Sequence, residues 1–189
     1  MSDATHRSAT RYATLTRALH WISAVLIIAS LTIGSIMVGE GLERSTQNLL
    51  FILHKNGGVI IFALVVLRLI WRGLRPAPPM PDSLPGWQAG AARLTHWGLY
   101  AMLLVMTISG YVRVRAGGFP IEMLDAISMS KGIPESEALE AIAQSVHCYG
   151  RFVLIPLIAL HVAAAIRHFI RRDGVAHRIW PPAGRLPRR

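Results

Sequence analysis

Ionisable side chains interrupt an otherwise apolar stretch near the carboxyl terminus. This stretch, SVHCYGRFVLIPLIALHVAAAIRHF (residues 145–169), contains three histidines and two arginines. An ionisable residue inside a membrane segment costs on the order of a few kcal/mol and usually has a partner or a function. Three more histidines, His20, His54 and His96, lie at or near the start of earlier apolar runs. Imidazoles in such places bind metals or carry protons, depending on which of them the fold brings together.

Four apolar runs must position these histidines: residues 18–38, 49–71, 94–112 and 146–170. A membrane span needs about 20 apolar residues, whereas a soluble core helix rarely exceeds about 15. The composition is 52% hydrophobic with a mean hydropathy of +0.42, as in a small membrane bundle. We predict an all-α fold, an integral-membrane four-helix bundle of residues 18–170, between an N-terminal segment (1–17) and a basic tail (171–189).

Positive charge is distributed unevenly between the segments outside these runs. Residues 1–17, 72–93 and 167–189 hold 13 Lys and Arg, against 4 in the other two loops. Cytoplasmic segments carry the excess of positive charge, so we predict that both termini are cytoplasmic. The net charge of +10 follows this topology, so we expect membrane lipid and no nucleic acid as the partner of the basic residues.

The histidines fall at two depths if successive runs cross in alternate directions. His54 and His147 then share one level. His20 and His161 share a second level, because 14 residues of helix separate His161 from His147 by about 21 Å and turn it by only about 40°. Two facing imidazoles suit axial ligation of a haem iron inside a bundle, with electron transfer as the chemistry. A zinc site would need more ligands, which only Cys148 offers at the first level.

Small residues one turn after each of these four histidines would leave room for a flat macrocycle. They are Ser23, Ala24, Gly57, Gly58, Gly150, Ala164 and Ala165. Gly57 and Gly58 have close helix packing as an alternative role. His96 is followed by the larger Leu99 and Tyr100, so we do not expect it to ligate a haem.

Basic residues near the predicted ligands have two interpretations. Lys55, beside His54, and Arg151, one turn after His147, either face the bundle and neutralise haem propionates or extend to the membrane interface. Arg68 is expected to extend to the interface. None of these three roles is fixed by spacing alone.

The motifs RALHW, FILHKNGG, LTHWGLYAMLLVMTISGY, VHCYGRF and LIALHVAAAIRHF resemble the bacterial cytochrome b561 family, over about residues 10–180. That family includes the cytochrome b subunits of nickel–iron hydrogenases and formate dehydrogenase. The resemblance implies the bacterial inner membrane, ubiquinone or menaquinone as substrate, and two non-covalent b-type haems. His20 with His161 would bind the cytoplasmic-side haem, and His54 with His147 the periplasmic-side one. One branch oxidises superoxide and reduces ubiquinone, and has a histidine at the position of His96, which makes His96 a candidate quinone residue.

Three functions remain open from the sequence. The first is a free-standing dihaem cytochrome that passes electrons from a periplasmic-side donor, such as superoxide, to quinone. The second is an anchor subunit that docks a periplasmic redox protein or catalytic subunit, and the third is a haem-free bundle that moves metal ions or protons.

The connections differ in length and charge. Residues 75–90, with five prolines, are expected to form an extended connector. The loop 113–145 is the longest and most acidic, and within it residues 134–145 predict a short helix leading into the fourth span. Superoxide would need Lys55, Arg113, Arg115 and Arg151 to form a local positive funnel. A basic docking protein would instead be attracted by Glu135, Glu137 and Glu140.

Overall fold

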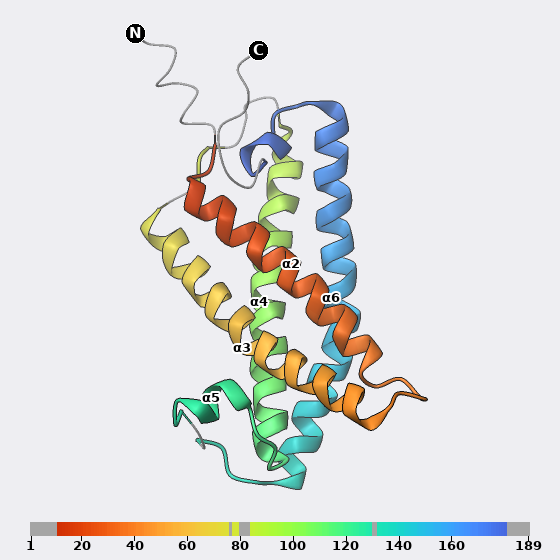
Figure 1. Ribbon diagram of the computed structural model, residues 1–189. Helices are drawn as coiled ribbons and strands as arrows, with labels where there is room; N and C mark the ends of the chain where they lie inside the picture. The colour runs from red at the N-terminus through yellow and green to blue at the C-terminus, as the bar shows by residue number, and fades with distance from the viewer. Residues whose placement is uncertain (1–10, 76, 80–83, 130–131, 181–189) are drawn as a thin grey trace.

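Four long α-helices make up most of the computed structural model, which describes residues 11–75, 77–79, 84–129 and 132–180 (Figure 1). They are α2 (Thr14–Ile36), α3 (Arg44–Leu74), α4 (Gly86–Ala116) and α6 (Glu137–Arg171). All four are long and apolar enough to cross a membrane. A five-residue helix, α5 (Glu122–Ala126), and a 3-10 turn, η1 (Ala176–Arg178), complete the described elements, which include no strand. The predicted all-α, four-helix fold is confirmed.

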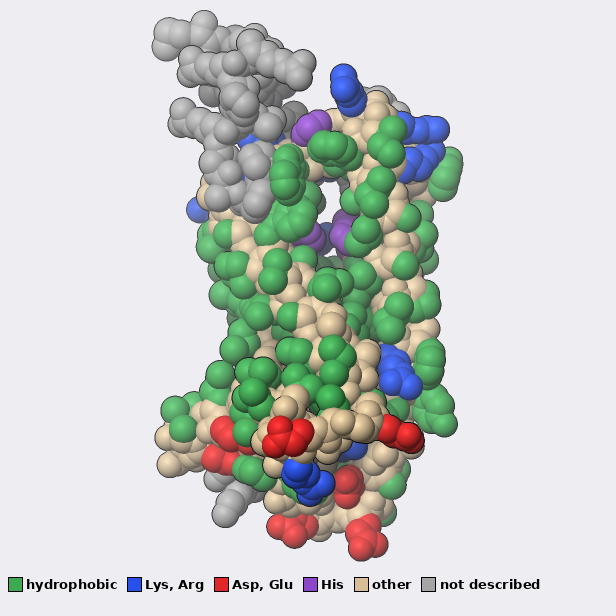
Figure 2. Space-filling model, turned by 45° about the vertical axis from the view of Figure 1, so that its right-hand side comes forward, with side chains coloured by type: hydrophobic (Ala, Val, Ile, Leu, Met, Phe, Trp, Pro, Cys, Tyr) green, Lys and Arg blue, Asp and Glu red, His purple; other side chains and the backbone are tan. Residues whose placement is uncertain are grey.

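The helices pack in chain order, and this leaves one side of the bundle loosely closed. α2 packs on α3, α3 on α4, and α4 along α6. Neither α2 nor α3 brings its backbone close to α6, and both helices are fully described. Figure 2 shows histidine side chains at the edge of an opening between the helices. We call the space between α6 and the α2–α3 pair the inter-helix gap.

A layer of apolar side chains closes the middle of the bundle. Ile61 and Val65 of α3 meet Leu103 of α4 and Leu154 of α6 in one buried cluster. Leu154 lies seven residues from each histidine of α6 that was predicted to bind haem. The apolar layer therefore separates the two predicted levels.

The two ends of the bundle differ in charge and in what covers them. At one end, the terminal end, Arg11 donates to the carbonyl oxygen of Trp180 at 2.8 Å, and Trp21 donates to that of Ile179 at 3.2 Å. The other end, the insert end, carries residues 117–129 and 132–136 with α5, which we call the insert (Figure 1). Acidic side chains gather at the insert end (Figure 2). The prediction that the terminal end is cytoplasmic rests on the sequence.

All four helices are longer than the predicted spans, and the extensions of α3, α4 and α6 shorten the loops. α4 begins at Gly86 and continues to Ala116, so Arg113 and Arg115 are helical and the proline-rich connector ends earlier than residue 90. The helix predicted for residues 134–145 is not separate, because α6 runs from Glu137 without interruption through Pro156. Ser136 caps its first turn by accepting from the Leu139 N–H at 3.3 Å. Residues 1–10, 76, 80–83, 130–131 and 181–189 of the predicted segments lie outside the described residues.

Polar contacts fasten the insert to α3 beside His54. Lys55 donates to the Pro120 carbonyl at 2.6 Å and pairs with Glu122 at 2.8 Å. Asn56 donates to the second oxygen of Glu122 at 2.8 Å and accepts from the Met123 N–H at 2.9 Å. The neighbour of a predicted haem ligand therefore fixes the position of α5.

We expect the docking of the insert to weaken in acid. Partial burial alone would raise the pKa of Glu122, but hydrogen bonds from Lys55 and Asn56 and the Lys55 charge lower it overall. A lowered pKa means that the docking stability is complete above the ordinary carboxyl value of 4.5 and is lost as the pH falls through the lower, folded value. Hydrogen–deuterium exchange of residues 119–129, corrected for intrinsic rates, should accelerate over that range.

The variant Glu122→Gln should show the accelerated exchange already at neutral pH, because an amide cannot pair with Lys55 as an anion does. Glu40→Gln, at an exposed position of the same end, is the matched control and should leave exchange unchanged. Equal exchange in Glu122→Gln and the unmodified protein would contradict the role of this ion pair.

Candidate haem-binding sites

His54 of α3 and His147 of α6 face each other across the inter-helix gap near the insert end. Their ring centroids are 6.0 Å apart, with ring planes at 88°. A metal–imidazole nitrogen bond is about 2.0–2.1 Å long and a ring centroid lies about 1 Å from its nitrogen, so two axial ligands on one ion have centroids roughly 6 Å apart. The spacing fits a single iron between the rings.

Backbone carbonyls on neighbouring helices orient both of these rings. His54 Nδ1 lies 3.1 Å from the Ser30 carbonyl oxygen of α2, and His147 Nδ1 lies 2.9 Å from that of Met106 on α4. A carbonyl oxygen only accepts, so each neutral ring carries its proton on Nδ1 and leaves Nε2 unprotonated. This is the form in which an imidazole binds iron, so the pair fits an axial ligand set.

Two glycines on those same helices let the rings lie against the backbone. A Cβ added to Gly34 of α2 would be 2.8 Å from His54 Cε1, and one added to Gly110 of α4 would be 3.0 Å from His147 Cε1. Sequence reasoning missed both glycines because it searched only the ligands' own helices. The sequence does contain a signal for them, a small residue one turn from a polar one, as in Ser30 and Gly34. Spacing along one helix does not show which other helix such a pair faces.

The glycines predicted from spacing have different surroundings. A Cβ added to Gly57 or Gly58 would meet no described atom within 4 Å. Among the described residues, these glycines therefore leave space beside His54 and do not pack closely against another helix. A Cβ added to Gly150 would lie 2.7 Å from the Met106 sulfur, so this glycine lets α6 approach α4. Their roles beside a macrocycle stay predictions.

His20 of α2 and His161 of α6 face each other towards the terminal end, with ring centroids 6.1 Å apart and planes at 67°. This spacing also matches two axial ligands. His96 of α4 joins them, with its ring 5.4 Å from that of His161. Among the described residues no group of three or more His, Cys, Asp or Glu is placed to hold a metal ion, so the zinc alternative with Cys148 gains no support.

Arg68 differs from its prediction. Its guanidinium turns into the bundle, where Nη2 lies 3.3 Å from His20 Nδ1 and the group stands 5.4 Å from the Tyr100 ring centroid. The expected extension to the membrane interface is therefore wrong for Arg68. A tertiary contact with His20 redirects the side chain, and no local pattern in the sequence reveals that contact.

The other basic residues near the His54/His147 pair have separate surroundings. Lys55 is held by the insert, and Arg151 is exposed, with its guanidinium 4.8 Å from the Phe152 ring centroid. Arg115 is buried in an ion pair with Asp125 at 2.6 Å. Arg113 lies on α4 one turn after Gly110, whose backbone is next to the His147 ring. The four basic residues do not form one positive funnel, because Lys55 and Arg115 are each paired with an acidic residue of the insert.

We expect Gly34→Ala or Gly110→Ala to remove the haem at the His54/His147 pair and to keep the other haem. The added methyl group would overlap an imidazole and push it away from its carbonyl partner. A Cβ contact under 3.0 Å forces the neighbouring atom to move, and one at 3.0–3.4 Å requires it to give by a few tenths of an ångström. Haem content per protein and the number of α-band components measure the loss. Gly90→Ala, which meets open space on α4, is the control and should keep both haems. Retention of both haems in Gly34→Ala would contradict this placement of His54.

Ligand replacement gives a second expectation. His54→Leu or His147→Leu should remove one haem, and His20→Leu or His161→Leu the other, because each change deletes an axial bond that the remaining imidazole cannot replace. His96→Leu is the matched control, a histidine of the same site that should leave both haems bound. Low-temperature difference spectra of the purified variants resolve the two components, and loss of a haem in His96→Leu would show that the pairing is incorrect.

Comparison with known proteins places these sites in context. The family model described as prokaryotic cytochrome b561 matches residues 11–182. Cytochrome b561 homolog 2 of Escherichia coli (strain K12) is 29% identical over 171 residues, which cover 89% of this chain and 90% of the relative. Cytochrome b561 homolog 1 of the same organism is 25% identical, covering 86% and 93%. A protein of Yersinia pestis named probable superoxide oxidase CybB is 23% identical, covering 90% and 96%.

Proposed function

Because this chain belongs to the prokaryotic cytochrome b561 family, a multi-pass membrane cytochrome family that implies b-type haem, we propose that it is a dihaem cytochrome of the bacterial inner membrane. It would transfer electrons from a periplasmic-side donor to the quinone pool. The observation that carries the proposal is the arrangement of two imidazole pairs, with ring separations of 6.0 and 6.1 Å, on opposite sides of one apolar layer.

The residues of each level have defined roles in this proposal. His54 and His147 hold one haem, and His20 and His161 hold the other. When bound, the haems supply one-electron carriers at the two levels, and so a route for electrons across the membrane. His96 lies beside His161 and has an imidazole that can hydrogen-bond a quinone oxygen. We therefore place quinone near the terminal end.

Superoxide is the donor that we favour. The name of the Yersinia pestis relative, probable superoxide oxidase, supports this donor for a chain of the same family. Two superoxide ions would become two O2 and release two electrons, and one quinone would take up these electrons with two protons to give quinol. In place of the four-residue funnel, the charge of Arg113, one turn after the glycine of α4 that lies next to His147, would attract the anion to that level.

The anchor-subunit function is the second candidate, and the insert favours it. Glu135 and Glu137 are exposed at the insert end, and the apolar side chains of Phe119 and Ile127 in the insert are exposed as well. A partner protein with a basic, partly apolar surface would complement this combination. The two candidates differ in whether a small anion alone reduces the haems.

We expect Arg113→Gln to slow haem reduction by superoxide several-fold at low ionic strength. The effect should shrink as salt rises, because mobile ions screen accessible charges over about 10 Å at 0.1 M. Arg115→Gln is the matched control two residues away, and it should change the rate less because Asp125 already balances the Arg115 charge. Stopped-flow absorbance across an ionic-strength series is the measurement.

A haem reduction rate that is indifferent to both substitutions and to salt would count against superoxide as the steered substrate. It would shift support to the anchor-subunit function. A purified protein without a b-type α-band would contradict both candidates and favour the haem-free bundle.

A further inference from the structure

Arg68 is a cation inside the bundle whose side chain contacts a predicted haem ligand. It belongs to α3, is only half-exposed, and places Nη2 3.3 Å from His20 Nδ1. A charge in a membrane-spanning helix is normally paired with an opposite charge or serves a function. An imidazole offers no negative charge, so this contact gives the guanidinium no counterion within the described part of the chain.

The direction of this hydrogen bond conflicts with iron ligation by the same ring. A guanidinium only donates, so His20 Nδ1 accepts, and the proton of the neutral ring is on Nε2. His54 and His147 show the opposite arrangement, because carbonyl oxygens face their Nδ1 atoms. For His20 to bind iron through Nε2, its proton must be on Nδ1, where a second donor such as Arg68 is no longer accommodated. Haem binding therefore requires Arg68 to change partner.

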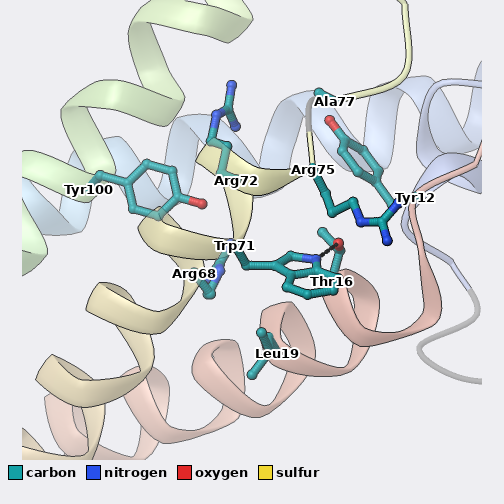
Figure 3. Close-up of a pocket in the computed structure, with 9 residues that line it drawn as sticks. All are labelled: Tyr12, Thr16, Leu19, Arg68, Trp71, Arg72, Arg75, Ala77 and Tyr100. Atoms are coloured by element: carbon teal, nitrogen blue, oxygen red, sulfur yellow. Dashed lines mark hydrogen bonds between the residues drawn. The ribbon is translucent and has the colours of Figure 1, made fainter.

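A cationic pocket lies beside Arg68 at the terminal end. Figure 3 shows Arg68 and Arg72 on α3 and Arg75 just after its end, with Tyr100 on one side and Tyr12 on the other. Arg68 and Arg72 are four residues apart and share one face of α3, whereas Arg75 follows the end of the helix in an extended conformation. None of the described residues that line this pocket is acidic. Arginines that line one pocket with no acidic residue in its described lining form a site suited to carboxylate or phosphate oxygens.

We propose that Arg68 exchanges His20 for a propionate carboxylate of the haem held by His20 and His161, with Arg72 as the second cation of this anion site. The proposal rests on the proposed function, since it needs a haem at this pair. Arg72 stands 5.6 Å from the Trp97 ring centroid, so it is packed in place on the same face as Arg68. The exchange gives Arg68 a counterion and frees His20 Nδ1 at the same time.

This assignment predicts a measurable property of one haem. A positive charge beside a haem stabilises its reduced, less positive state, so removing the charge lowers the reduction potential. In holo-protein carrying Arg68→Gln, the potential of the His20/His161 haem should fall and that of the other haem should stay constant. Arg68→Lys should give an intermediate potential, because lysine keeps the charge and loses the bidentate geometry.

The test combines potentials with a direct probe of the carboxylate. Spectroelectrochemical titration gives the two potentials, and redox-difference infrared spectra of protein with 13C-carboxyl haem propionates report the propionate bands. Arg68→Gln should shift those bands, and Arg93→Gln, an exposed arginine near the same end, should shift neither bands nor potentials. If Arg68→Gln loses the haem, Arg68→Lys carries the same test with a smaller band shift.

Three other results would overturn the proposal, and each has a different spectroscopic signature. Unchanged propionate bands in both Arg68 variants would refute the propionate contact, while two intact haem spectra would leave the proposed function standing. A potential that depends on added phosphatidylglycerol, with unchanged propionate bands, would identify a lipid phosphate as the anion instead. Absence of the two haem spectra in the unmodified protein would remove the proposed function and this inference together.

Discussion

The inter-helix gap is the constraint on which the rest of the structure depends. α6 packs closely on α4, and only side chains connect it to α2 and α3. Its histidines at positions 147 and 161 reach across that gap to His54 and His20. Imidazoles facing an apolar gap are costly unless something polar or metallic joins them, so the geometry that leaves α6 apart also creates the demand for a cofactor. The apolar layer around Val65 and Leu154 keeps the two joining points separate.

The two histidine pairs differ in which groups of the protein orient their rings. At the His54/His147 pair, backbone carbonyls set both ring orientations, and Gly34 and Gly110 let the rings approach the neighbouring helices. Backbone groups in a packed helix barely move, so the orientation of both rings is fixed by the fold. At the other pair, Arg68 contacts His20 Nδ1, and in our proposal it turns to a haem propionate instead. Backbone dipoles at one pair and a side-chain charge at the other would then tune the two sites separately.

The insert connects ligand position to the choice of electron donor. Lys55 follows His54 directly, and its ion pair with Glu122 ties α5 to the helix that carries this ligand. Because Asp125 balances Arg115, the field at this end depends more on Arg113 than a count of basic residues indicates. Pairing within the insert thus decides which charges remain available to an approaching anion.

Local properties of the sequence determined the fold class, the four spans and the pairing of histidines by depth. Hydropathy marks a span and helical rise fixes depth along it, and both are independent of how helices rotate against one another. Only the tertiary structure decided which helix faces each ring. The carbonyls of Ser30 and Met106, the glycines at 34 and 110, the inward turn of Arg68 and the Lys55–Glu122 pair all depend on helix rotation and on contacts between distant segments. Such contacts leave no periodic signal in a single sequence, because each joins residues whose spacing along the chain is set by loop length rather than by helical geometry.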